Sequence, residues 1–172
     1  MKWPRCQKNF ANVNFEAPPP ILDSARVVLY ALVGDLVYRP HNRLYRGNTL
    51  VERVPSLAIC ENLGDDVGPM LFHCDGDWTV LGVIGGDSVE SCKSAAAKRY
   101  PGVENRWIDR GVSAEDALNY YDSLPGNNSC SFCGKRPFQI QGGFADGKDA
   151  RICKECVDAY HLAFVEMAND SP

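Results

Sequence analysis

Apolar and β-branched residues alternate with turn residues through the first half of the chain, and this pattern predicts strands. Residues 26–33 and 56–60 are short apolar runs, each ended by glycine or polar residues, and both are typical of buried strands. A helix is the alternative for 26–33. Residues 70–74 and 78–84 flank an Asp-Gly-Asp turn at 75–77, so we expect a hairpin in which the glycine supplies the positive φ.

Helices are predicted in the region from 87 to 124. Asp87 is in position to cap the first, with Glu90 three residues later, and an apolar stripe ends before a Pro-Gly pair. The stripe consists of Val89, Cys92, Ala95, Ala96 and Tyr100. Ser113 caps a second helix over 114–124, and residues 106–110 are a short strand candidate. This order of strands and helices predicts a small α+β domain with a mostly antiparallel sheet.

Proline-rich and turn-rich segments divide the chain into three parts. The first 25 residues include an Asn-rich stretch and Ala-Pro-Pro-Pro at 17–20, which favours an extended path. We expect an arm that is ordered only against the following domain. Residues 125–129 are rich in turn formers and mark a boundary. The predicted organisation is an arm over 1–25, an α+β domain over 26–125 and a small module over 126–172.

The small module contains two Cys-x-x-Cys pairs, Cys130 with Cys133 and Cys153 with Cys156. This spacing lets both sulfur atoms of a tight turn face one ion, and Zn²⁺ takes four thiolates tetrahedrally at about 2.3 Å. Because thiolates fill all four positions, we expect one structural zinc ion; a catalytic zinc keeps a position for water. A disulfide or a redox pair is the alternative. Between the two pairs, residues 138–144 with their Gly-Gly step suggest a hairpin.

The residues around these cysteines are more specific than their spacing. The stretches Cys130-Ser-Phe-Cys133-Gly-Lys and Ile-Cys153-Lys-Glu-Cys156-Val resemble the N-terminal zinc-binding domain of the ClpX unfoldase, over about residues 128–168. The resemblance implies a treble-clef fold, zinc on these four cysteines, and a module that dimerises and recognises substrates or adaptor proteins. ClpX carries this domain ahead of an ATPase, whereas here the module comes last without one, so unfoldase activity is not carried over.

A final helix is predicted to continue from Cys156, with Tyr160, Phe164 and Met167 at helical spacing on its apolar side. This stripe exceeds what a module of about forty residues can bury around a metal ion, and exposed apolar patches usually mark contacts. One hypothesis is therefore a protein partner, or a homodimer formed through the zinc module. The alternative is that the stripe docks on the N-terminal domain of the same chain.

The net charge of −4 weakens a general affinity for nucleic acids, since phosphate binding depends on clustered Lys and Arg. The local exception is the segment 38–53, where Arg39, Arg43 and Arg46 interleave with tyrosines. One interpretation is an anion or nucleic-acid surface, in which arginines bind phosphates and aromatic rings stack on bases. The other, which the acidic total favours, is a hairpin or loop whose charged side chains are simply solvated.

The remaining cysteines indicate packing more than chemistry. Cys60 and Cys92 lie in apolar contexts typical of small buried side chains, and Cys6 lies in the arm. Cys74 adjoins His73, which would suit a thiol enzyme, but neighbours on a strand point to opposite faces.

Composition limits where the protein acts. With 45% apolar and 23% charged residues and no apolar run long enough to span a membrane, the chain is expected to be soluble. Free thiols and a thiolate metal site favour a reducing cytoplasm. Together with these features, the resemblance to the ClpX zinc-binding domain implies a non-enzymatic, cytoplasmic bacterial protein that acts as an adaptor, an inhibitor or an assembly subunit. Nucleic-acid binding through 38–53 is the competing hypothesis.

Overall fold

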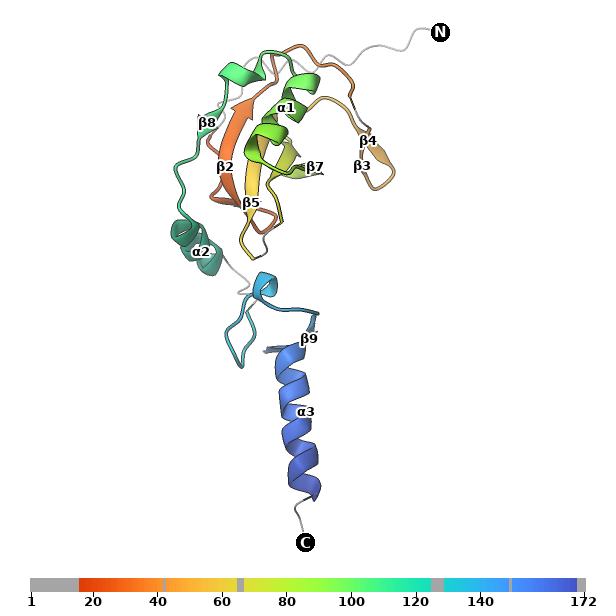
Figure 1. The fold of residues 1–172 in the computed structure, drawn as a ribbon, viewed down its shortest axis with the longest axis vertical. Coiled ribbons are helices and arrows are strands. Elements are labelled where there is room, and N and C mark those ends of the chain that lie inside the picture. The colour runs from red at the N-terminus through yellow and green to blue at the C-terminus, as the bar shows by residue number, and fades with distance from the viewer. Residues whose placement is uncertain (1–15, 42, 65–66, 125–128, 149, 170–172) are drawn as a thin grey trace. The chain divides into compact units, whose positions relative to one another are not determined.

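The computed structural model describes residues 16–41, 43–64, 67–124, 129–148 and 150–169, and the chain divides into two compact units (Figure 1). The first unit comprises residues 1–121 and the second residues 122–172. Most of the predicted arm, including Cys6, and most of the predicted linker lie outside the described residues.

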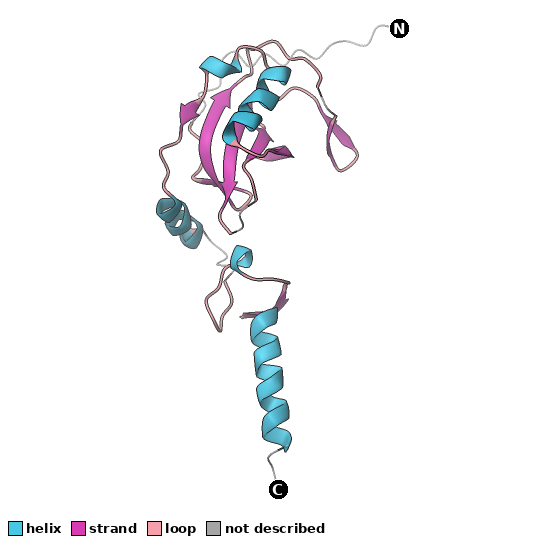
Figure 2. Cartoon of the chain, in the orientation of Figure 1, coloured by secondary structure: helices cyan, strands magenta, loops and turns pink. Residues whose placement is uncertain are grey.

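An antiparallel sheet forms the centre of the first unit (Figure 2). Its main path runs β1-β2-β5-β6-β7, and β1 and β8 pair with successive parts of one edge of β2. The strands are β1 (Ile21–Leu22), β2 (Ala25–Leu32), β5 (Ser56–Asn62), β6 (Met70–Cys74), β7 (Val80–Gly85) and β8 (Ile108–Asp109). The predicted α+β class and antiparallel sheet are confirmed. Each predicted strand is present, the one at 70–74 with the predicted bounds and the others with shifted ends.

Helix α1 (Val89–Arg99) covers one face of this sheet (Figure 1). Side chains alternate between the two faces of a strand, so every second residue of β2, β5 and β6 contributes to the core under the helix. The core includes Ala31, Val33, Leu57, Ile59, Leu71, Cys92, Ala96 and Tyr100. All five residues of the predicted helix stripe pack in or against this cluster, which confirms the stripe. A short 3-10 turn, η1 (Val103–Asn105), follows the helix.

The opposite face carries a second cluster, and the proline-rich segment adjoins it. Its buried members are Leu22, Ala25, Val27, Ala58, Cys60, Phe72, Cys74 and Trp78. The indole N–H of Trp78 donates to the Glu16 carbonyl at 2.9 Å, and Arg110 Nε donates to the carbonyl of the fully buried Pro18 at 2.8 Å. Residues 16–22 are therefore part of the folded unit, as expected of an arm ordered against the domain.

The turn between β6 and β7 differs from the sequence prediction. The positive φ, +62°, belongs to Trp78 and not to Gly76, and β7 begins at Val80. The cause is Asp75, whose Oδ1 accepts hydrogen bonds from the N–H groups of Asp77 at 3.0 Å and Thr79 at 2.8 Å. These bonds extend the turn by two residues beyond the predicted Asp-Gly-Asp.

One of the two predicted helix caps is also corrected. The N-cap of α1 is Ser88 and not Asp87, because the Ser88 and Ser91 hydroxyls each accept from the backbone N–H of the other. Helix α2 (Ala114–Ser123) begins as predicted. Ser113 Oγ accepts from the Asp116 N–H at 3.0 Å and donates to the Asp116 carboxylate at 2.6 Å.

The segment 38–53 contains a separate hairpin, β3 (Leu44–Arg46) with β4 (Thr49–Val51), set beside the main sheet (Figure 1). Leu44 packs directly on Gly82 of β7, where any Cβ atom would overlap its side chain. Val51 is buried in the core under α1. One side chain of each strand therefore packs against the rest of the first unit and anchors the hairpin there, while the tip of the hairpin is exposed to solvent.

The second unit consists of a 3-10 turn, a small hairpin and a long helix: η2 (Pro137–Gln139), β9 (Phe144–Asp146), β10 (Arg151–Cys153) and α3 (Lys154–Asn169). The hairpin predicted at 138–144 is wrong, since the chain forms η2 there and the hairpin comes later. Proline favours the first position of a helical turn because it lacks an N–H and has a helical φ. Within the described residues, no helix combines the length and apolar character needed to cross a membrane.

Candidate metal centre

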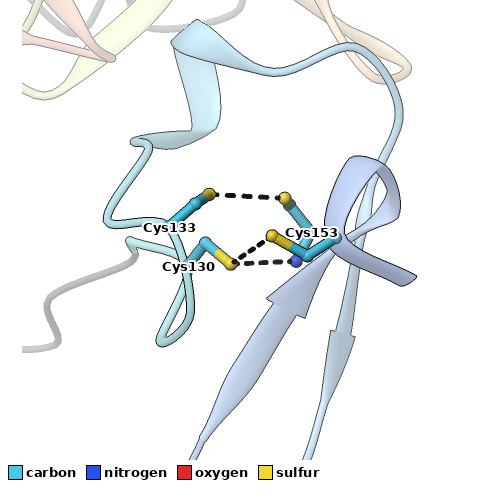
Figure 3. A group of neighbouring side chains, drawn as sticks. Cys130, Cys133 and Cys153 are labelled. Carbon is cyan, nitrogen blue, oxygen red and sulfur yellow. Dashed lines mark hydrogen bonds between the residues drawn. The ribbon is translucent and has the colours of Figure 1, made fainter. Parts of the chain in front are cut away.

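A tight turn positions the first cysteine pair. The Gly134 N–H donates to the Cys130 carbonyl and the Cys130 N–H donates to the Lys135 carbonyl, both at 2.9 Å. Gly134 has a φ of +72°, in the left-handed region where a Cβ atom is costly. This turn places the thiols of Cys130 and Cys133 on the same side of the backbone (Figure 3).

The second pair lies where β10 passes into α3. Cys153 is the last residue of β10, and Cys156 is in the first turn of the helix. Two hydrogen bonds join this strand to the first turn: the Ser131 N–H donates to the Arg151 carbonyl at 2.8 Å, and the Arg151 N–H donates to Ser131 Oγ at 3.1 Å. Backbone pairing therefore brings together two cysteine pairs that are distant in the sequence.

The four sulfur atoms form a cluster of the size that zinc requires. Cys130 Sγ lies 3.8 Å from Cys156 Sγ, Cys133 Sγ lies 3.7 Å from Cys153 Sγ, and all four lie within 4.8 Å of one another. A tetrahedron with metal–sulfur distances of about 2.3 Å has sulfur–sulfur edges of about 3.8 Å. A disulfide needs about 2.05 Å, and all four cysteines are free. The four thiols thus fit a metal ion and not the disulfide alternative.

The electrostatics of the cluster also favour a cation. Burial acts to raise the pKa of Cys130, but the backbone N–H groups of Cys133, Cys153 and Phe132 outweigh it and lower the pKa to about 6. Desolvation and then the neighbouring thiols raise the pKa of Cys156 to about 12. Four thiolates this close together repel one another, so a bound divalent cation is needed to keep all of them ionised. The four cysteines could therefore hold one metal ion, with zinc as the best match.

The predicted interaction residues lie on the exposed surface of α3. Tyr160 is 47% exposed, Phe164 65% and Met167 67%. The ring of Phe132, between the first two cysteines, packs edge-on against Tyr160 with centroids 5.4 Å apart, and it is itself 57% exposed. Sequence reasoning missed Phe132 as part of this surface, although an aromatic residue inside a tight Cys-x-x-Cys turn has little room to be buried.

The other candidate residues lie in the first unit, away from the cysteine cluster in the chain. Arg39, Arg43 and Arg46 are exposed on the β3–β4 segment. His73 and Cys74 are both buried on β6, and burial raises the pKa of the Cys74 thiol to about 12. His73 shares the α1 side with Leu71, whereas Cys74 belongs to the opposite cluster, so the two side chains are separated by the sheet.

Cys60 and Cys92 are buried as the sequence predicted. Comparison with known proteins adds no family assignment: no protein-family model, no curated protein and no solved structure matches this chain.

Proposed function

We propose that this chain is a non-enzymatic zinc protein whose second unit is a ClpX-like treble clef that recognises protein, in the first instance a second copy of itself. Two features support the treble-clef assignment. The chain forms a cysteine turn, a hairpin and a helix in that order, and one cysteine pair comes from the turn while the other comes from the strand–helix junction. Four thiolates complete the usual tetrahedral set of zinc, which leaves no position for a reacting water.

The observation that carries the proposal is an apolar seam on α3. The seam consists of Val157, Tyr160, Phe164 and Met167, each between 41% and 67% exposed. Their spacing of three, four and three residues is that of the a and d positions of a two-stranded coiled coil. The partner that best fits such a seam is another helix with the same spacing, and a second copy of α3 supplies one. Phe132 extends the seam at its cysteine end.

The expected strength of this association is modest. Burying the exposed half of an apolar side chain contributes about 1 kcal/mol, so ten such side chains across two copies contribute about 10 kcal/mol. Loss of translational and rotational freedom costs at least about 4 kcal/mol, which leaves about 6 kcal/mol and a Kd on the order of 40 µM. A protein partner with a longer helix would bind more tightly than a second copy.

The test compares two substitutions on the same helix. Phe164→Ser removes a seam residue, whereas Leu162→Ser removes a side chain that is 62% exposed on the other side of α3. Sedimentation equilibrium of the full chain between about 5 and 500 µM should show a monomer–dimer equilibrium. Phe164→Ser removes about 2 kcal/mol per dimer and should raise the Kd about 30-fold, whereas Leu162→Ser should leave it unchanged, with the zinc content the same in both.

Two outcomes would contradict the proposal. One is a chain that stays monomeric throughout the range while Phe164→Ser lowers the stability of the first unit, which would mean that the seam docks on its own domain. The other is a dimer that the two substitutions weaken equally, since the association would then not depend on the a and d spacing.

A further inference from the structure

The arginine side chains in the described part of the chain are mostly satisfied by the protein itself. Four form ion pairs with carboxylates: Arg26 with Glu61, Arg106 with Asp35, Arg136 with Asp122, and Arg151 with Asp146. Three donate to backbone carbonyls: Arg53 to Gly34 and Leu36, Arg99 to His41, and Arg110 to Pro18. Arg39, Arg43 and Arg46 have no such side-chain partner among the described residues, and they lie within eight positions of one another.

The backbone that carries these three arginines is held in place. The Arg39 N–H donates to the Arg99 carbonyl at 2.8 Å, and Arg99 Nε donates to the His41 carbonyl at 2.7 Å. Arg99 itself is 1% exposed, so this connection lies inside the unit. Leu44 and Val51 also anchor the hairpin to the core, so the backbone is tied to the folded unit at Arg39 and again at the hairpin, and such anchoring lowers the entropy cost of binding a ligand.

The outer face of the hairpin places an aromatic side chain beside Arg43. Tyr45 pairs with Leu50 across the strands, and the two are 51% and 42% exposed. Since Leu44 and Val51 point to the core, Tyr45 and Leu50 point away from it, and Arg43 lies on the same outer face two residues from Tyr45. Arg46, the last residue of β3, lies on the same face as Leu44 but at the exposed tip. Gly47, with a φ of +58°, closes the tip next to Arg46. Glu52 is the single acidic residue in the segment 38–53 and has no ion pair within the described structure.

From this combination we infer that the β3–β4 hairpin binds a short stretch of single-stranded nucleic acid. Arg43 would contact a phosphate beside Tyr45, whose exposed ring would stack on an unpaired base against Leu50. Arg46 at the tip and Arg39 before the hairpin would contact the neighbouring phosphates. Phosphates explain three cations that have no carboxylate partner among the described residues, and a base explains the exposed aromatic ring beside Arg43. An acidic peptide would use the arginines alone. The net charge of −4 weakens non-specific binding elsewhere on the chain, so such binding depends on this local cluster of cations.

The geometry sets the expected size of the effects. With three phosphate contacts to a single strand, log K should fall with log salt with a slope of about −2, and each lost arginine should reduce the slope by about 0.7. Loss of one stacked base weakens binding by about 5- to 150-fold.

Fluorescence anisotropy with labelled twelve-nucleotide oligo-dT and oligo-U, at about 50 mM salt and with the zinc-loaded full chain, tests this inference. Arg46→Ala should weaken binding and flatten the salt dependence, whereas Lys148→Ala, which removes one exposed cation from the second unit, should do neither. Tyr45→Ala should weaken binding by the stacking factor, and Tyr45→Phe should restore it. Binding of either strand type with this pattern supports the inference.

Several results would overturn this inference. They are the absence of binding to either oligonucleotide, an equal loss of affinity in Arg46→Ala and Lys148→Ala, or an affinity that Tyr45→Ala leaves unchanged. A glutamate peptide of matched charge that competes as well as the oligonucleotide would also overturn it, since the hairpin would then be a site for acidic protein segments.

Discussion

The described residues of the second unit have almost no apolar core apart from the four-cysteine cluster, so a metal ion bound there would decide whether the unit folds. Among the described residues after 121, the buried hydrophobic side chains are Cys130 and Cys153. Their burial contributes at most about 3 kcal/mol each, whereas a structural zinc site contributes on the order of 10–16 kcal/mol. Helix α3 has 16 residues, a length at which an isolated helix is marginal in water. The unit should therefore be unfolded without metal.

Cys133→Ser tests this reasoning with a single atom change. The substitution leaves three thiolates around the ion. Loss of a residue that hydrogen-bonds to a metal ligand lowers metal affinity by about 10- to 100-fold, or about 1.4–2.7 kcal/mol, and we expect the loss of a ligand itself to lower the zinc affinity by more. With a chelator present, α3 should lose its amide protection in hydrogen-exchange mass spectrometry. Protection of α1 should be unchanged, because α1 packs on a sheet that contains no metal ligand.

Cys92→Ser is the matched control, since it makes the same change at a buried cysteine of α1 outside the cluster. That variant should keep one zinc per chain and a protected α3. Retained protection of α3 in metal-free Cys133→Ser would refute the role given to the metal. Loss of α1 protection together with α3 would refute the independence of the two units.

Further predictions concern the first unit. Burial, and then Arg99, lower the pKa of His73 from 6.5 to about 4. Between these pH values the unfolded chain binds a proton that the folded chain does not. Stability should therefore fall by about 3 kcal/mol as pH drops through this window, and urea unfolding followed by tryptophan fluorescence should show a flatter pH dependence in His73→Leu. An unchanged dependence would contradict this. Gly82→Ala, which forces Leu44 to move, should cost about 1–3 kcal/mol in the same assay, while Gly85→Ala, with open space around it, should not. Equal costs for the two would contradict the packing role of Leu44.

Predictions from short-range sequence signals succeeded where the structure depends on neighbouring residues. The strands of the sheet, the α1 stripe and the Ser113 cap all follow from patterns spanning a few residues. The same holds for the four clustered cysteines, because each pair is positioned by local structure, the first by a tight turn and the second by the junction of β10 and α3. Errors occurred where two short-range signals competed, as with Ser88 against Asp87 and with Trp78 against Gly76.

Surface properties were less predictable, because they depend on which side chains find partners. From the sequence, Arg43 and Arg106 look alike, yet Arg106 pairs with Asp35, which lies 71 positions earlier, and Arg43 pairs with no described carboxylate. Phe132 joins the α3 surface through a ring contact with Tyr160 that no spacing rule indicates. Partners at such separations are set by the fold.

The sequence by itself determined the α+β class, most strands and helices, and the four cysteines that cluster at metal-binding distances. Backbone propensity, capping and ligand spacing act over a few residues, so they can be recognised along the chain. Only the tertiary structure decided that β8 lies beside β2 and that Arg99 is buried under the segment it anchors. The same holds for the three arginines of 39–46 that have no ion-pair partner in the part of the chain that the structure describes. These features depend on contacts between residues far apart in the chain, and the energy of each contact exists only once the fold has brought its partners together.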